Sequence, residues 1–132
     1  MKIIIVNSKD EIKSLNSKET LVHFGFRPSN NDIFELLQAC PKLKALHIPA
    51  SYMRTISGTT KMYLEMHEIA LLEGNVWGHR KDIDEYYEIK PEIRERIKEL
   101  KSEGMADSDI LDRMVRETRL SRDLLEFMLK GK

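Results

Sequence analysis

The chain has few of the features that identify an export route or a redox chemistry. A single cysteine, Cys40, occurs in 132 residues, so the chain cannot form an internal disulfide and a reducing compartment is expected. We expect this thiol to be buried. The apolar segment near the start covers only residues 3–6, whereas a signal peptide has an apolar core of roughly 7–15 residues. These features predict a cytoplasmic protein that is not bound to a membrane.

Neither sign of charge is in excess. Lys and Arg together number 22, as do Asp and Glu, which gives a formal net charge of zero. This balance provides no long-range attraction to nucleic acid or anionic membranes, so the charge disfavours nucleic-acid binding. It also weakens the self-repulsion that keeps proteins monomeric, and we therefore expect a homodimer.

Motifs that carry chemistry are scarce as well. The chain lacks the Gly-rich spacing of a P-loop, and its four histidines have no close His or Cys neighbours of the kind that bind zinc. No Ser-His-Asp or paired-carboxylate arrangement can be argued from spacing. We therefore expect no metal and no cofactor, and a non-enzymatic protein is favoured over an enzyme.

The clearest positive signal is a pattern that occurs twice, 22 residues apart. Leu21, Phe24, Phe26 and Ser29 recur as Leu43, Leu46, Ile48 and Ser51. Each copy is an apolar strand that runs into a polar turn with a proline, and a helical stretch separates the copies. The pattern predicts an α/β fold with a small, mostly parallel sheet of four strands. The expected strands are 2–7, 21–26, 43–48 and 69–74, and the expected helices between them are 10–15, 30–39 and 59–68.

The period-2 rule assigns Phe24 and Leu46 to one face of this sheet, which must be core, and His23 and His47 to the other. We expect the face with the histidines to be covered only in part within the α/β repeat, with the C-terminal helices completing the cover, and these side chains to be half-buried. A leucine-rich-repeat-like arc is the alternative architecture, although two clear copies are fewer than a solenoid needs.

The remaining residues predict three helices. Pro91 opens the first and Gly104 closes it, the second begins near Asp107, and Ser121 is a good N-cap for the third. We divide the chain into a parallel α/β domain, 1–78, and a helical, helix-turn-helix-like segment, 79–132, that packs on the sheet.

This helical segment gives the alternative function of a DNA-binding transcriptional regulator. The candidate DNA-binding residues are Arg113, Arg116, Arg119 and Arg122. Two observations oppose it. The second helix is about one turn longer than the compact motif allows, and the third carries Asp123 and Glu126, whereas phosphate binding needs clustered positive charge.

The leading site hypothesis is an anion site at the carboxyl ends of the strands, where open α/β sheets bind ligands. The candidate residues are Arg27, Ser29, Asn30, Ser51, Ser57, Thr59, Thr60, Lys61, His79 and Arg80. They would hold a phosphorylated small molecule between arginines, hydroxyls and a helix N-terminus. The competing explanation is that the Ser and Thr residues are helix caps. If the protein is instead a small enzyme acting on a phosphorylated metabolite, His79 is the candidate for proton transfer.

Three aromatic residues, Trp77, Tyr86 and Tyr87, lie near the junction of the two parts. They either seal the sheet against the helical segment or form an interface with a partner.

The segments FRPSNNDIF, HIPASY, ALLEGNVWGHRKDIDEYYE and MVRETRLS together resemble an uncharacterised family from methane-producing archaea. The resemblance covers nearly the whole chain and implies an archaeal, soluble protein, but it carries no catalytic residues. The sequence thus favours a non-enzymatic regulatory or adaptor protein that acts by binding, with a phosphorylated small ligand as the first candidate.

Overall fold

The computed structural model describes residues 2–76 and 86–130. The first part contains β1 (Lys2–Val6), the 3-10 helix η1 (Lys9–Ser14), β2 (Leu21–Phe24), α1 (Asn30–Ala39), β3 (Ala45–Ile48), α2 (Ala50–Met53), α3 (Gly58–Met66) and β4 (Ala70–Glu73). The second part contains β5 (Tyr86–Glu88), α4 (Pro91–Ser102), α5 (Asp107–Thr118) and α6 (Arg122–Lys130). The α/β class and the four expected strands are confirmed.

The sheet has five strands in the order β4-β3-β2-β1-β5. Strands β1 to β4 are parallel, and β5 pairs antiparallel with β1, with Ile3 opposite Tyr87. The predicted count of four strands is therefore wrong by one. Strand β5 has only three residues, too few to show an alternating pattern, and it exists because it pairs with the otherwise open edge of β1.

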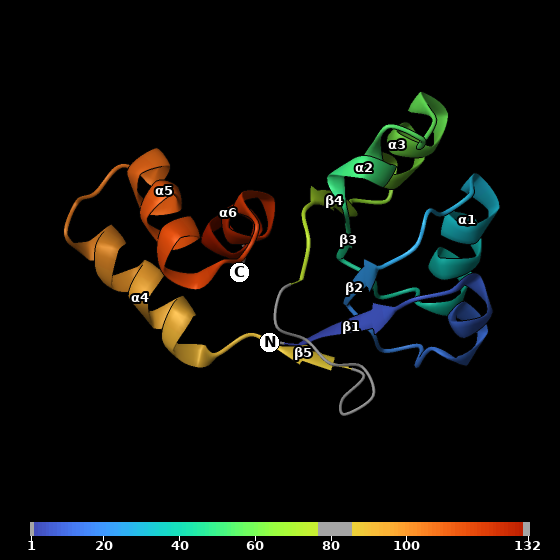
Figure 1. Cartoon of the computed structure of the whole chain (residues 1–132), viewed down its shortest axis with the longest axis horizontal. Helices are drawn as coiled ribbons and strands as arrows, with labels where there is room; N and C mark the ends of the chain where they lie inside the picture. Colours follow the sequence, from blue (N-terminus) through green and yellow to red (C-terminus); the bar gives the residue numbers. More distant parts are fainter. Residues whose placement is uncertain (1, 77–85, 131–132) are drawn as a thin grey trace.

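One face of the sheet is covered by the crossover segments η1, α1 and α3 (Figure 1). Phe24 and Leu46 point to this side and pack with Ile12 of η1, Ile33 of α1 and Leu64 of α3. All five side chains are almost completely buried. The helix α1 begins where predicted, because Ser29 and Asp32 form a reciprocal capping box.

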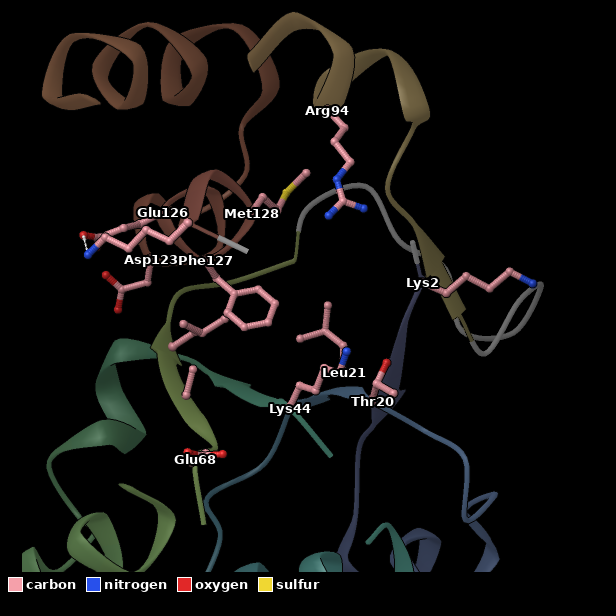
Figure 2. A pocket seen from close by; sticks show the side chains of 13 residues that line it. Lys2, Thr20, Leu21, Lys44, Glu68, Arg94, Asp123, Glu126, Phe127 and Met128 are labelled. Atoms are coloured by element: carbon pink, nitrogen blue, oxygen red, sulfur yellow. Dashed lines mark ion pairs between the residues drawn. The ribbon is translucent and has the colours of Figure 1, made fainter. Parts of the chain in front are cut away.

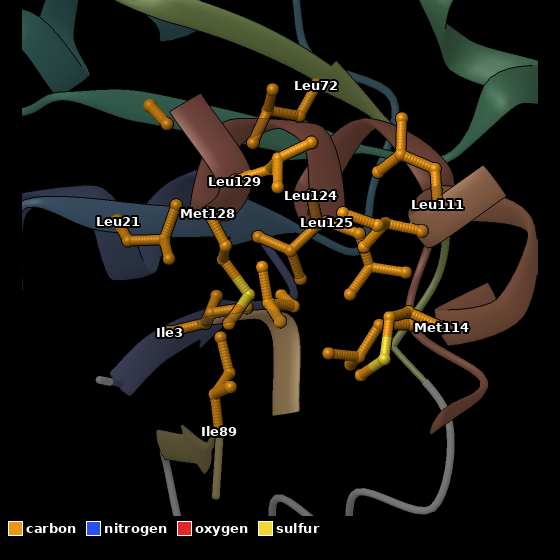
Figure 3. Close-up of a cluster of buried hydrophobic side chains, with 14 of the residues drawn as sticks. Ile3, Leu21, Leu72, Ile89, Leu111, Met114, Leu124, Leu125, Met128 and Leu129 are labelled. Carbon is orange, nitrogen blue, oxygen red and sulfur yellow. The ribbon is translucent and has the colours of Figure 1, made fainter. Parts of the chain in front are cut away.

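The opposite face is covered by α4, α5 and α6 (Figure 1). Figure 3 shows Leu21 and Leu72 of the sheet among Leu124, Leu125 and Met128 of α6. Each element alone would leave an apolar face in water, so the two sides are stabilised by burying each other.

One expectation about this second face needs correction. His23 and His47 are 5% and 0% exposed, so they are buried rather than half-buried, and the C-terminal helices complete the cover of the face as expected. The reason is that α6 packs directly against β4, and its four buried apolar side chains lie over the sheet.

The strand order also bears on the arc-like alternative. Strands β1 to β4 follow chain order and their crossovers lie on one face, as in a repeat protein. A solenoid leaves its strand face open, whereas here three helices cover it. The fold is therefore a closed three-layer α/β arrangement.

Candidate nucleic-acid interface

The helices α5 and α6 are joined by a three-residue turn, residues 119–121. Arg119 ends α5 in the left-handed conformation, with φ of 62°, and this reverses the chain direction. Leu120 is buried in the core on the helical side of the sheet. Ser121 then caps α6, since its Oγ accepts a hydrogen bond from the backbone N–H of Leu124 at 3.2 Å. The predicted cap at Ser121 is confirmed.

The four arginines proposed for DNA binding are all exposed, but their surroundings differ. Arg113 forms an ion pair with Glu117 one turn away on α5, at 3.2 Å. Arg122 is paired with Asp112. Arg116 and Arg119 have no ion pair with any of the described residues, and Arg119 and Arg122 line a shallow surface cavity beside Asn75 and Ser121. The structure thus places Arg119 and Arg122 at the α5–α6 turn and Arg116 in the last turn of α5, and we call these three residues the arginine turn.

The helix α6 itself is held against the sheet by more than apolar packing. A carboxylate oxygen of Asp123 accepts a hydrogen bond from the backbone N–H of Glu73 on the edge strand β4 at 2.8 Å. Glu126 is paired with Lys130 at 3.0 Å along the same helix. In this arrangement both basic side chains of α6, Arg122 and Lys130, are paired with carboxylates, so the helix carries no row of unpaired positive charge along its length.

A buried chain of hydrogen bonds joins the sheet to the start of α6. The Nδ1 atoms of His23 and His47 lie 2.7 Å apart, and Nε2 of His47 lies 2.8 Å from Oγ of Ser121. Gly74 lies directly beside this contact, because a Cβ at that position would be 2.2 Å from the Cβ of Ser121. We call His23, His47, Ser121 and Gly74 the junction.

Burial lowers the pKa of His47 to about 4, against a smaller opposing effect of Asp123. A neutral imidazole has one N–H and one lone pair, which suits the two contacts that His47 makes. Such a weak base is a poor proton acceptor at neutral pH, so the Ser121–His47 pair fits a structural link better than a nucleophile and its base. The sequence predicted the cap at Ser121 and placed His23 and His47 on one face of the sheet. It did not predict that His47 contacts Ser121.

The predicted anion-site residues fall into three groups. In the first group, the side chains of Asn30, Ser57 and Thr60 contact one another. Oγ1 of Thr60 donates to Oδ1 of Asn30 at 2.8 Å, and Oγ of Ser57 accepts from the backbone N–H of Thr60 at 3.1 Å. These contacts explain the polar residues as caps of α3 that tie it to α1.

In the second group, Ser29 caps α1, Arg27 lies over the ring of Tyr52 at 5.6 Å, and Ser51, Thr59 and Lys61 are exposed. The third group, His79 and Arg80, lies outside the described residues. Strands β1 to β4 follow chain order, so the described part of the sheet has no reversal of strand order between them at which a ligand crevice would form. The anion site stays a prediction.

Of the three aromatic residues predicted to lie between the two parts of the chain, Tyr86 and Tyr87 are on β5. Trp77 lies outside the described residues. Tyr86 packs toward the α1 and α3 side and donates its hydroxyl hydrogen to a carboxylate oxygen of Glu19 at 2.5 Å. Tyr87 packs toward the helical side. Tyr87 therefore lies against the helical segment and Tyr86 on the opposite face of the edge strand, and the alternatives of a seal and of an interface both stay predictions.

Other kinds of site find no support in the described ranges, 2–76 and 86–130. They contain no cluster of three His, Cys, Asp or Glu residues that could hold a metal ion. They also contain no helix of the length and apolarity that crossing a membrane requires. Cys40 is buried as expected, and burial, helped by nearby Glu19, raises the pKa of its thiol to about 11.

The fold and the arginine turn together define a parallel α/β protein that carries a three-helix unit of the helix-turn-helix kind. Residues 2–85 match the N-terminal domain of a family of unknown function, DUF1699, and residues 92–130 match its C-terminal HTH domain. The chain belongs to this family. No curated protein and no solved structure gives a significant match. The archaeal origin stays a prediction.

Proposed function

We propose that the protein is a DNA-binding regulator that contacts the sugar-phosphate backbone through the arginine turn. The description of residues 92–130 as an HTH domain supports this proposal. The observation that carries it is the exposure of Arg116, Arg119 and Arg122 around one tight turn. Two of the three have no carboxylate partner among the described residues, so their charge is available to phosphates.

The mode of binding differs from that of a helix inserted along a groove. The apolar side of α6 is buried in the sheet, and Asp123 is bonded to β4. The contact therefore runs through the end of α5, the turn and the first residue of α6. Because phosphate contacts supply most of the non-specific affinity, a compact cluster of arginines gives binding even though the whole chain carries no net charge.

The test is fluorescence anisotropy with a labelled DNA duplex at several salt concentrations. About two phosphate contacts, from Arg116 and Arg119, predict a slope of log K against log salt near −2. Arg119→Gln should weaken binding and reduce the magnitude of this slope by about 1. Arg113→Gln is the matched control, because Arg113 lies on the same helix but is paired with Glu117. Absence of binding at low salt, or equal losses for both variants, would reject the proposal.

The proposal includes a homodimer, which would present two arginine turns to one duplex. Its candidate surface is α3, where Met62 and Met66 are 62% and 77% exposed one turn apart. Sedimentation velocity at several concentrations should show a dimer that Met66→Lys weakens, with Lys61→Met on the same helix as the control. A strict monomer at high micromolar concentration would remove this part of the proposal.

A further inference from the structure

A cavity of about 720 Å³ lies between the sheet and the C-terminal helices (Figure 2). It opens at the amino ends of β2, β3 and β4, opposite to the edge where the sequence predicted an anion site. The helices α4 and α6 form its other wall. Its volume is in the range that holds small organic ligands.

The inner wall of this cavity is apolar. Leu21 and Leu72 of the sheet and Met128 of α6 are buried side chains with one edge on the cavity, and the ring of Phe127 projects into it (Figure 2). These side chains offer a surface for a hydrocarbon chain or a ring, and covering that surface would release water at a gain of about 25 cal/mol per Å².

Two basic side chains at the opening are directed toward the cavity. Lys44 extends toward the cavity from the start of β3, and Arg94 points into it from α4 (Figure 2). Lys44 forms no ion pair with any residue in the described ranges.

The acidic side chains of α6 that line the cavity already have hydrogen-bond or ion-pair partners. Asp123 accepts the hydrogen bond from β4, and Glu126 is paired with Lys130. Glu68 lies at the end of the cavity away from Arg94 (Figure 2). Lys44 is therefore a cation at this opening that no carboxylate among the described residues pairs with.

We propose that this cavity is a binding site for a small amphipathic carboxylate. Its apolar body lies on Leu21, Leu72 and Phe127, and its carboxylate is bound by Lys44 at the opening. A charge-assisted hydrogen bond to a carboxylate in a partly desolvated site is stronger than a neutral one, so the anion gives the site its selectivity. The proposal stands apart from DNA binding, because none of its residues belongs to the arginine turn.

The test is a titration of the full chain with decanoate, followed by two-dimensional amide NMR in the absence of nucleic acid. We expect saturable shifts confined to the residues around the cavity. Decylammonium, which has the same chain and the opposite charge, should bind at least about tenfold more weakly.

Two lysine variants provide the matched comparison. Lys44→Met keeps an apolar chain of similar length and removes the charge, and it should weaken decanoate binding by about tenfold. Lys42→Met, two residues away and also exposed, does not line the cavity and should leave binding unchanged. A dispersed amide spectrum shows that each variant is folded. Absent or surface-wide shifts, equal binding of decylammonium, or equal behaviour of the two variants would overturn the proposal.

Discussion

At the scale of single residues, Gly74 is restricted both by its backbone conformation and by the atoms around it. Its φ of +151° disfavours any side chain, and an added Cβ would lie 2.2 Å from the Cβ of Ser121 and 3.0 Å from Nε2 of His47. Neither neighbour can move without breaking the junction, because both are hydrogen-bonded there. A glycine is required at this position for close approach as well as for its backbone angle.

We therefore expect Gly74→Ala to lower the free energy of unfolding by roughly 3 kcal/mol. The control is Gly104→Ala, since Gly104 also has a positive φ, of +81°, but no atom within 4 Å of the added Cβ. Left-handed backbone alone should cost about 1 kcal/mol there. Urea denaturation measures both values, and equal losses would show that the contact with Ser121 carries no weight.

His47 makes the stability depend on pH. Its pKa is about 4 in the folded protein and about 6.5 when the chain is unfolded. The unfolded state therefore takes up a proton first as the pH falls, so stability is complete above pH 6.5 and decreases between pH 6.5 and 4. The contribution of His47 to this loss should be about 2 kcal/mol at pH 5.

Urea denaturation at pH 7.5 and pH 5 checks this expectation in the wild type and in His47→Gln. The difference between the two proteins should shrink at pH 5, because the variant cannot take up this proton. His67→Gln replaces an exposed histidine that is not part of the junction, and it should follow the wild type. A gap between wild type and His47→Gln that is the same at both pH values would contradict the assignment.

At the scale of elements, the sequence predicted the helices and strands whose positions are set by residues nearby in the chain. The bounds of α1 were predicted because Ser29 caps its start and Pro41 follows its end. The four-residue helix α2 and the three-residue β5 were missed, because elements so short show no periodicity of their own. The strand faces were predicted, since alternation alone assigns them.

The junction could not be predicted in the same way. His47 and Ser121 are 74 residues apart in sequence, and only the docking of α6 on β4 brings them together. The same docking closes the cavity with Phe127 and Met128. By contrast, the capping role of Ser29 and Ser57 was one of the two alternatives open from sequence, and the structure agrees with it.

A comparison of two capping serines distinguishes the effect of a helix cap alone from the added effect of a contact with His47. Ser29→Ala removes an exposed cap of α1 and should cost about 1 kcal/mol. Ser121→Ala removes the cap of α6 and also leaves Nε2 of the buried His47 without its partner, so the cost should be about 3 kcal/mol. Equal costs in urea denaturation would mean that the contact with His47 adds nothing to the cap.

At the scale of the whole molecule, the sheet and the C-terminal helices share one core. Leu21 and Leu72 of the sheet are buried only because Leu125 and its neighbours on α6 cover them. The proposed division at residue 78 therefore describes the chain order of the two parts and does not make them independent in stability. It also separates β5 from its partner β1.

This shared core predicts a single cooperative unfolding transition. Leu125→Ala, which removes a fully buried side chain of α6, should lower the free energy of unfolding by about 3 kcal/mol. Amide signals of β2 and of α5 should disappear at the same urea concentration in both the wild type and this variant. Lys98→Ala on the exposed side of α4 is the control and should shift neither. If the α5 signals were lost while those of β2 persisted, the helical segment would be a separately folding domain, and the link through His47 and Ser121 would not couple the arginine turn to the sheet.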